Sequence, residues 1–134
     1  MDSIKGTYLS NFYESKVVYE KLAYRNAEAA FQSMKTVDLV LRGKFVDLTG
    51  SEAKFLGKRI KLRDDWDDIK LRVMYEIVNA KFAQNPTITK WLVDTNDEVI
   101  VEGNTWGDTF WGVCNGKGQN HLGIILMAIR EEAK

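Results

Sequence analysis

Three polar residues with acid–base and nucleophilic chemistry lie at helical spacing in segment 26–35, which reads NAEAAFQSMK. On a helix, Glu28, Gln32 and Lys35 form one polar stripe, because residues three and four positions apart share a face. About 10.5 Å of helix separates Glu28 from Lys35, which is too long for a direct ion pair and suits two groups that flank a small bound molecule. Such an acid, amide and amine could form half of an active site. The same pattern is typical of a solvated helix flank, so both interpretations stay open at this point.

A helix must position this stripe. Its N-cap is predicted to be Asn26, and it is expected to run to about Leu41, with Gly43 as a natural stop. The neighbouring face of the helix is apolar and would pack in the core through Ala27, Ala30, Phe31 and Met34.

Cap residues and apolar spacing predict the remaining elements. A short helix is expected to begin after the N-cap Ser51 and to end at Gly57, and a long amphipathic helix is expected from the N-cap Asp64 to about Ala83. Another short helix would open at Pro86 and continue through Leu92, and a last helix would follow the loop 116–123. Short strands are expected at 17–19 and 99–101. The fold class is therefore α+β, a single compact domain over residues 1–134 that is predominantly helical with a few short strands.

Composition narrows the classes of function. The formal net charge is zero, which argues against a broad electrostatic grip on a nucleic-acid backbone but not against binding one nucleotide. The single cysteine, Cys114, allows no internal disulfide and is expected to be a packed small residue. With only one histidine, His121, the chain offers too few ligands for a zinc site, and neither a metal nor a cofactor is expected. The absence of a signal peptide and of a long apolar run predicts a cytoplasmic location without membrane contact.

The segment 103–123 differs from the rest of the chain. Trp106, Asp108 and Trp111 lie close together among glycines, and the two indole rings could stack a nucleobase or simply pack. The following loop, 116–123, contains Gly118 and leads into a helix, where free N–H groups and the helix dipole suit a phosphate. The alternative is a tight turn and cap, and the loop matches neither the P-loop nor the dinucleotide fingerprint.

An ordered set of motifs covers nearly the whole chain and resembles the NADAR superfamily. The matching pieces are 9–13 (LSNFY), 27–35 (AEAAFQSMK), 56–59 (LGKR), 62–66 (LRDDW), Met74, 81–82 (KF), 92–95 (LVDT), 101–102 (VE), Asp108, 111–112 (WG), 118–123 (GQNHLG), 126–127 (LM) and Arg130. The chain departs from the family at Ala29, where members usually carry histidine. Members also usually carry a strand before the first motif, whereas eight residues precede it here.

The resemblance implies an N-glycosidase that cuts the bond between a base nitrogen and a ribose C1′. The implied substrates are phosphoribosylated intermediates of riboflavin synthesis or ADP-ribosylated bases such as guanine. The implied catalytic residues are Glu28, Lys35 and Asp108. Taken together, the resemblance and the residue patterns above give as candidate substrate-binding residues Asn11, Phe12, Gln32, Trp66, Glu102, Trp106, Trp111, Gly118 and Asn120. Trp66 also lies on the apolar face of its predicted helix and, on periodicity alone, is expected in the core.

The chemistry of the reaction agrees with these residue types. A carboxylate near C1′ stabilises the positive charge that develops on the ribose, and an acid protonates the departing base. The resemblance implies that the lysine forms a Schiff base with the sugar. Two alternatives stay open, a catalytically silent module that binds ADP-ribose or a nucleotide, and a helical interaction protein. The expected partner is a small ribosylated or ADP-ribosylated molecule, possibly carried on DNA.

Overall fold

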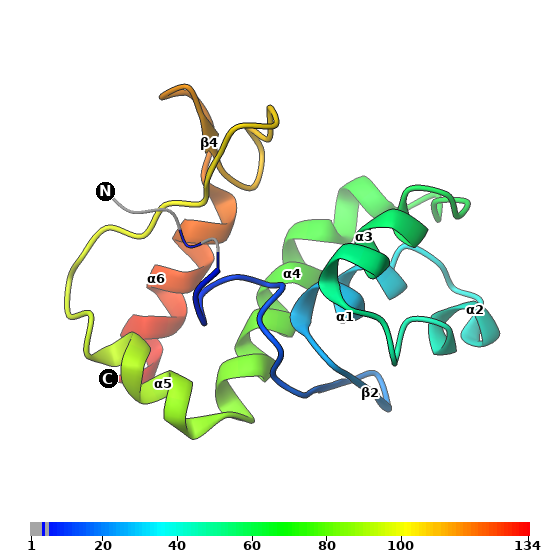
Figure 1. Ribbon diagram of the computed structural model, residues 1–134, viewed down its shortest axis with the longest axis horizontal. Helices are drawn as coiled ribbons and strands as arrows, with labels where there is room; N and C mark the ends of the chain where they lie inside the picture. The colour runs from blue at the N-terminus through cyan, green and yellow to red at the C-terminus, as the bar shows by residue number, and fades with distance from the viewer. Residues whose placement is uncertain (1–3, 5) are drawn as a thin grey trace. The chain divides into compact units, whose positions relative to one another are not determined.

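The computed structural model describes residues 4 and 6–134 (Figure 1). Helices predominate among them and the strands are few and short, which confirms the predicted α+β class. The described chain divides into two compact units. We call Asn11–Asn85 the N-terminal unit, and Pro86–Lys134 together with the described residues up to Ser10 the C-terminal unit. In the part of the chain that the structure describes, no helix combines the length and the apolar character needed to cross a membrane.

The N-terminal unit is built around α1 (Figure 1). A hairpin of β1 (Val17–Tyr19) and β2 (Leu22–Tyr24) leads into α1 (Ala27–Ser33), and α2 (Leu39–Gly43), α3 (Gly50–Gly57) and α4 (Trp66–Ala83) follow. Helix α1 packs against α3, α4 and the hairpin. Every residue of α1 is buried, so this helix forms the centre of the unit, and any chemical group on it lies at an interface between helices.

The first helix is shorter than the sequence suggested. Its N-cap Asn26 is confirmed, since the side-chain oxygen accepts the Ala29 N–H at 2.8 Å. The predicted extension to Leu41 is wrong, because α1 ends at Ser33 and α2 begins separately. The carboxylate of Asp38 accepts the N–H groups of Val40 and Leu41, and such an N-cap starts a new helix.

Two other predicted caps are wrong by one or two residues. The N-cap of α3 is Thr49 and not Ser51, because Thr49 and Glu52 form a reciprocal capping box. The residue before α4 is Asp65 and not Asp64, and it makes no side-chain cap. Its carboxylate is bonded to Arg63 at 2.6 Å instead. The predicted ends of these helices at Gly57 and Ala83 are confirmed.

The C-terminal unit contains α5 (Pro86–Val93) packed against α6 (His121–Ala133). Between them β3 (Gly103–Asn104) pairs in parallel with β4 (Val113–Cys114). The start of α5 at Pro86 is confirmed, whereas the strand predicted at 99–101 is wrong, since β3 begins only at Gly103. The apolar face of α6 is buried through Leu122, Ile125, Leu126 and Ile129.

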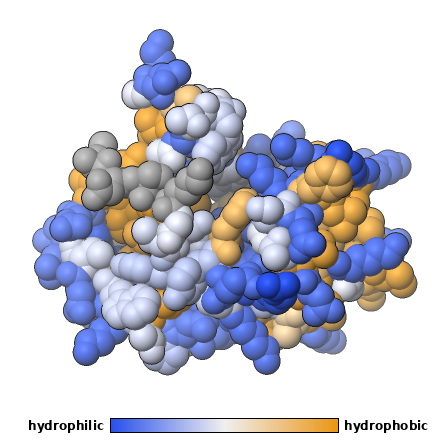
Figure 2. Space-filling view, viewed as in Figure 1, coloured by the Kyte–Doolittle hydropathy of each residue, from blue (hydrophilic) through white to orange (hydrophobic). Residues whose placement is uncertain are grey.

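Apolar side chains also lie on the surface of the N-terminal unit, over α2 and α3 (Figure 2). Val37, Leu39, Val40 and Phe55 are each at least 60% exposed. The guanidinium of Arg59 covers one face of the Phe55 ring at 3.4 Å from the centroid. Helix α2 has no buried residue, so it contributes little to the core.

Candidate functional site

The polar stripe of α1 is buried. Glu28 is 9% exposed and Gln32 is 5% exposed, so the interpretation as a solvated flank is wrong for these two residues. Burial of a carboxylate and an amide costs free energy unless both are hydrogen-bonded. Their contacts therefore show how this part of the helix is stabilised.

Gln32 and Glu28 bond to each other across one helical turn. The Gln32 Nε2 donates to Glu28 Oε2 at 2.7 Å, while Gln32 Oε1 is buried and has no hydrogen-bond partner among the described residues. The backbone of Glu28 is fixed by its N–H, which donates to the Asn11 carbonyl at 2.9 Å. The side chain of Asn11 is buried as well, and its Oδ1 also lacks a partner in the part of the chain that the structure describes. Two unpartnered buried acceptors therefore lie on either side of Glu28 in the sequence, at two of the predicted substrate-binding positions.

Lys35 lies just beyond the end of α1 and not within it. Its N–H donates to the Gln32 carbonyl at 3.2 Å, and its own carbonyl accepts the Arg63 N–H at 2.8 Å. Burial lowers the pKa of the Lys35 amine below its usual range, Glu28 opposes this effect, and Lys58 and Lys54 add to it. A lowered pKa increases the neutral fraction of an amine at neutral pH, which is its nucleophilic form.

Close contact between α1 and α3 holds the Gln32 side chain in place. A Cβ added at Gly57 would lie 1.9 Å from Gln32 Oε1 and 2.7 Å from its Cδ. Only glycine at position 57 therefore allows the amide to lie between the two helices and to bond Glu28.

We expect Gly57→Ala to displace the Gln32 side chain and to lower the free energy of unfolding by about 1–3 kcal/mol. Urea denaturation measures this change. Gly43→Ala is the matched control, because a Cβ at Gly43 meets nothing within 4 Å. Adding Gln32→Ala to Gly57→Ala should recover part of the loss, and an equal loss with and without Gln32 would contradict the proposed clash.

The two aromatic candidates of the N-terminal unit differ in exposure. Trp66 is 5% exposed and packs on Phe31 with ring centroids 5.0 Å apart, which confirms it as a core residue. Phe12 is 42% exposed, and its ring lies against the backbone of Gly50, where a Cβ would come within 2.6 Å. Phe12 is therefore the one of these two rings that solvent reaches.

In the C-terminal unit, Asp108 shapes a turn. Its Oδ1 accepts the N–H groups of Phe110 at 3.1 Å and Trp111 at 2.9 Å. Its own backbone is held by Asn104, whose side chain bonds both the N–H and the carbonyl of Asp108. Both turn bonds use Oδ1, so Oδ2 is the oxygen of this carboxylate that remains for other chemistry.

The prediction of free N–H groups at the start of α6 is wrong for four consecutive residues. The N–H groups of Gln119, Asn120, His121 and Leu122 donate to the carbonyls of Thr109, Gly112, Phe110 and Trp111, at 2.8–3.3 Å. Gly118 has φ +153°, and a Cβ there would lie 2.1 Å from the Gly112 carbonyl. The loop is therefore folded onto the preceding turn, and these N–H groups are not available to a phosphate.

The side chain of Asn120 joins the loop before α6 to the segment before β3 by hydrogen bonds. Its Nδ2 donates to the Ile100 carbonyl at 2.9 Å, and its Oδ1 accepts the Glu102 N–H at 2.9 Å. The residue has φ +53° and ψ +40°, a left-handed conformation that asparagine tolerates better than most residues. The structure thus places Asn120 and Glu102 together, through the backbone of Glu102.

Asn120→Ala should lower the free energy of unfolding by about 2–4 kcal/mol, because it removes two hydrogen bonds and leaves alanine at positive φ. Asn115→Ala is the matched control, since Asn115 has the same φ of +53° and is exposed. Chemical denaturation of both variants separates the two causes. Equal losses would mean that the hydrogen bonds of Asn120 contribute nothing.

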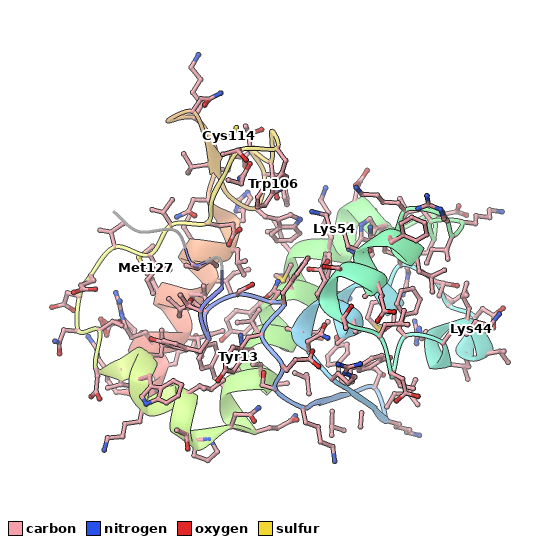
Figure 3. All side chains as sticks on the ribbon, in the orientation of Figure 1. Tyr13, Lys44, Lys54, Trp106, Cys114 and Met127 are labelled. Carbon is pink, nitrogen blue, oxygen red and sulfur yellow. The ribbon has the colours of Figure 1, made fainter. Side chains whose placement is uncertain are left out.

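The two tryptophans of this unit also differ. Trp106 is 50% exposed in the loop that follows β3 (Figure 3). Trp111 is half-buried and packs edge-on against Phe110, with ring centroids 4.8 Å apart, and Phe110 packs in turn on His121 at 4.6 Å. Of the predicted base-stacking pair, Trp106 has the more accessible ring.

Cys114 is buried with a free thiol, as expected for a packed small residue. Among the described residues, no three His, Cys, Asp or Glu side chains come together in a way that could hold a metal ion.

Sequence reasoning gave no role to three lysines. The positive charges of Lys54 and Lys58 lower the pKa of Lys35. Lys81 is fully buried on α4. A signal was available for Lys81, because it lies three and four positions after the buried residues Val78 and Ile77 and hence on the apolar face of α4.

The sequence matches the family model of the NADAR domain over residues 2–134. It is 44% identical over 89 residues to an N-glycosidase of Nostoc punctiforme, covering 64% of this chain and 56% of that protein. It is 34% identical over 129 residues to a riboflavin biosynthesis protein of Vibrio vulnificus, covering 93% of this chain and 35% of that protein. The NMR structure of the Escherichia coli protein YbiA superposes with a TM-score of 0.84 at 30% identity, covering 98% of this chain and 82% of that one.

Proposed function

Because the chain belongs to the NADAR family, we propose that it is an N-glycosidase, which hydrolyses the bond between a base nitrogen and C1′ of a ribose. The observation that carries this proposal is the half-buried Lys35 amine with a lowered pKa, close enough to the buried Glu28 for the two charges to interact. The name of the Nostoc relative supports the same reaction.

In the proposed mechanism, the neutral Lys35 amine attacks C1′. A bond forms between Nζ and C1′, the bond from C1′ to the base nitrogen breaks, and the base leaves with a proton. The sugar ring then opens to a Schiff base, and addition of one water molecule releases the ribose and restores the amine. The net reaction consumes one water molecule.

Glu28 has two roles in this proposal. Its carboxylate stabilises the positive charge that develops on the ribose ring, and it accepts the proton that the amine loses on attack. The hydrogen bond from Gln32 orients the carboxylate. The Gln32 amide donates to Oε2 of Glu28 and not to Oε1.

The remaining candidate residues keep the roles implied by the family resemblance. Within the C-terminal unit, Asp108 offers Oδ2 as the carboxylate oxygen that the turn bonds do not use. In the same unit, Trp106 has the ring that a base could stack on, because it is half exposed, and Asn120 holds the backbone of Glu102 in position. We also propose a cytoplasmic location.

The proposed substrates are a phosphoribosylated riboflavin-pathway intermediate or an ADP-ribosylated base. The name of the Vibrio relative supports the first. Incubation with phosphoribosylated amines, ADP-ribose and ADP-ribosylated DNA, followed by mass spectrometry for released base, separates a metabolite from a nucleic-acid substrate. Failure to release base from any of them would overturn the proposal.

Borohydride reduction during turnover tests the covalent step. A Schiff base on Lys35 would be reduced to a stable adduct, which peptide mass spectrometry locates. A protein that binds ADP-ribose without any adduct or release of base would be a silent binding module instead.

A further inference from the structure

Segment 53–63 of the N-terminal unit is the most basic stretch of the chain. It reads AKFLGKRIKLR and contains five lysines and arginines and no acid, whereas the chain as a whole has a formal net charge of zero. Helix α3 ends at Gly57, so most of these cations follow the helix. Such a run of basic residues is a local positive patch on a chain that is not basic overall, and patches of this kind attract polyanions.

Three of these cations have no carboxylate partner. Lys58, Arg59 and Lys61 are exposed, and the ion pairs of the described residues include none of them. Arg63 differs, because its Nε and Nη2 donate to the two carboxylate oxygens of Asp65 at 2.6 and 3.1 Å. The charge that the segment offers to a partner therefore lies on residues 58, 59 and 61.

The side chain of Arg59 is held in one position with two nitrogens left over. Its Nη1 donates to the Phe55 carbonyl at 2.9 Å, and its guanidinium carbon lies 3.4 Å from the centroid of the Phe55 ring. Nε and Nη2 are the same two nitrogens that Arg63 uses on its carboxylate, and in Arg59 they make no hydrogen bond to the described part of the chain. This edge of a guanidinium binds two phosphate oxygens in the same bidentate way.

The ring of Phe55 is an exposed aromatic platform. The side chain is 60% exposed, although the guanidinium of Arg59 covers one face of the ring. That contact keeps the ring oriented through a cation–π interaction. The other face of such a ring can stack an unpaired nucleobase of any kind, because every base has an aromatic face.

We infer that Phe55, Lys58, Arg59 and Lys61 form a surface that binds a single-stranded nucleic acid. The three cations contact its phosphates, and one base stacks on Phe55. A single strand fits better than a duplex, whose bases are already stacked on one another. It also fits better than an anionic membrane, because the exposed large apolar side chains of the segment are only Phe55 and Leu62, whereas membrane binding uses a whole apolar face.

Fluorescence anisotropy with a labelled, unmodified DNA strand of about 12 nucleotides tests the surface. The wild type should bind the strand, and its affinity should fall as salt is added. Arg59→Ala and Lys61→Ala should each weaken binding and reduce the slope of log affinity against log salt by about 0.7. Phe55→Leu should weaken binding about tenfold and leave the slope unchanged, because it removes stacking and no charge. The same strand in a duplex should bind more weakly.

Two exposed cations outside the segment provide matched controls. Arg72 lies on α4 with its side chain 63% exposed, and Lys44 is exposed beyond α2 (Figure 3). Arg72→Ala and Lys44→Ala remove the same charges from the same unit and should retain the affinity of the wild type. Thermal denaturation of every variant establishes that it is folded.

Three results would overturn the surface. They are no binding of the strand by the wild type, losses in Arg72→Ala and Lys44→Ala equal to those in the segment, and binding to phosphatidylserine vesicles without binding to the strand. The last would assign the segment to a membrane surface instead.

This inference goes beyond the proposed function and fails separately from it, because the test strand carries no ribosylated base. Release of base from a ribosylated substrate, without binding of the plain strand, would overturn the surface and leave the N-glycosidase activity standing. Binding of the strand through Phe55 and Arg59, without release of base from any substrate, would support the surface and overturn the activity.

Discussion

Lys35→Arg should fold normally, bind its ligand and lose base release by several orders of magnitude. The guanidinium stays protonated at any pH at which the protein is folded, so it cannot attack C1′. The backbone of residue 35 is held on both sides by hydrogen bonds to Gln32 and Arg63, and these bonds do not depend on the side chain. The measurement is single-turnover release of base, with circular dichroism to establish folding.

Lys44→Arg, the same substitution at an exposed position, is the control. We also expect base release by the wild type to rise with pH through the lowered pKa of Lys35, because the neutral amine is the reactive form. Turnover by Lys35→Arg at a near wild-type rate would exclude the covalent route, and the carboxylates of Glu28 and Asp108 would then be tested as the groups that activate water.

The second large effect is on stability. Lys81 is fully buried in α4, with its Nζ 5.2 Å from the centre of the Phe82 ring and 5.8 Å from that of Tyr13. Burial lowers its pKa from 10.5 to about 7. A difference of this size between the unfolded and folded states corresponds to about 5 kcal/mol of destabilisation when the lysine is charged in both.

The sign of the pH dependence follows from these values. Below pH 7 the lysine is charged in both states, and the folded state bears the full cost. Between pH 7 and 10.5 only the unfolded state binds the proton, so this residue makes the protein more stable as pH rises. Above 10.5 both states are neutral and the cost is gone.

Lys81→Met should therefore raise the free energy of unfolding by about 2–4 kcal/mol at pH 6, and the gain should shrink as pH approaches 10. Urea denaturation at several pH values measures it, with Lys44→Met as the exposed control. A variant that is less stable than the wild type at pH 6, or equally changed at every pH, would show that the Lys81 side chain is needed in some other way.

Signals within one or two helical turns of the sequence, such as cap residues and apolar periodicity, predicted much of this fold. The N-cap Asn26, the start of α5 at Pro86 and the periodicity of α4 were readable because each depends on residues within one or two turns. The strand predicted at 17–19 is confirmed as β1, but its partner β2 and the hairpin that joins them were not predicted. Its turn residues, Glu20 and Lys21, have φ of +48° and +71°, a conformation that usually requires glycine or asparagine.

The candidate site was predictable in its residue types and not in its contacts. The spacing of Glu28, Gln32 and Lys35 indicated a shared face, but their burial depends on α3, which packs over them through Gly57. Likewise, the N–H groups before α6 look free in the sequence. They are bonded because segment 109–112 folds back onto them, and a contact between separate segments leaves no local signal.

The hydrogen bond between Gln32 and Glu28 has a direction, and that direction depends on the proton content of Glu28. An ionised carboxylate only accepts, so the amide must present Nε2 to it, as it does here. Once Glu28 is protonated, its O–H needs an acceptor, and the unpartnered Oε1 of Gln32 becomes the better atom to face it. The side-chain amide of Gln32 would then rotate by half a turn about its terminal C–C bond, which exchanges the positions of Nε2 and Oε1. The side-chain amide resonances of Gln32 in the free protein would thus report which of its two atoms faces Glu28, without any substrate.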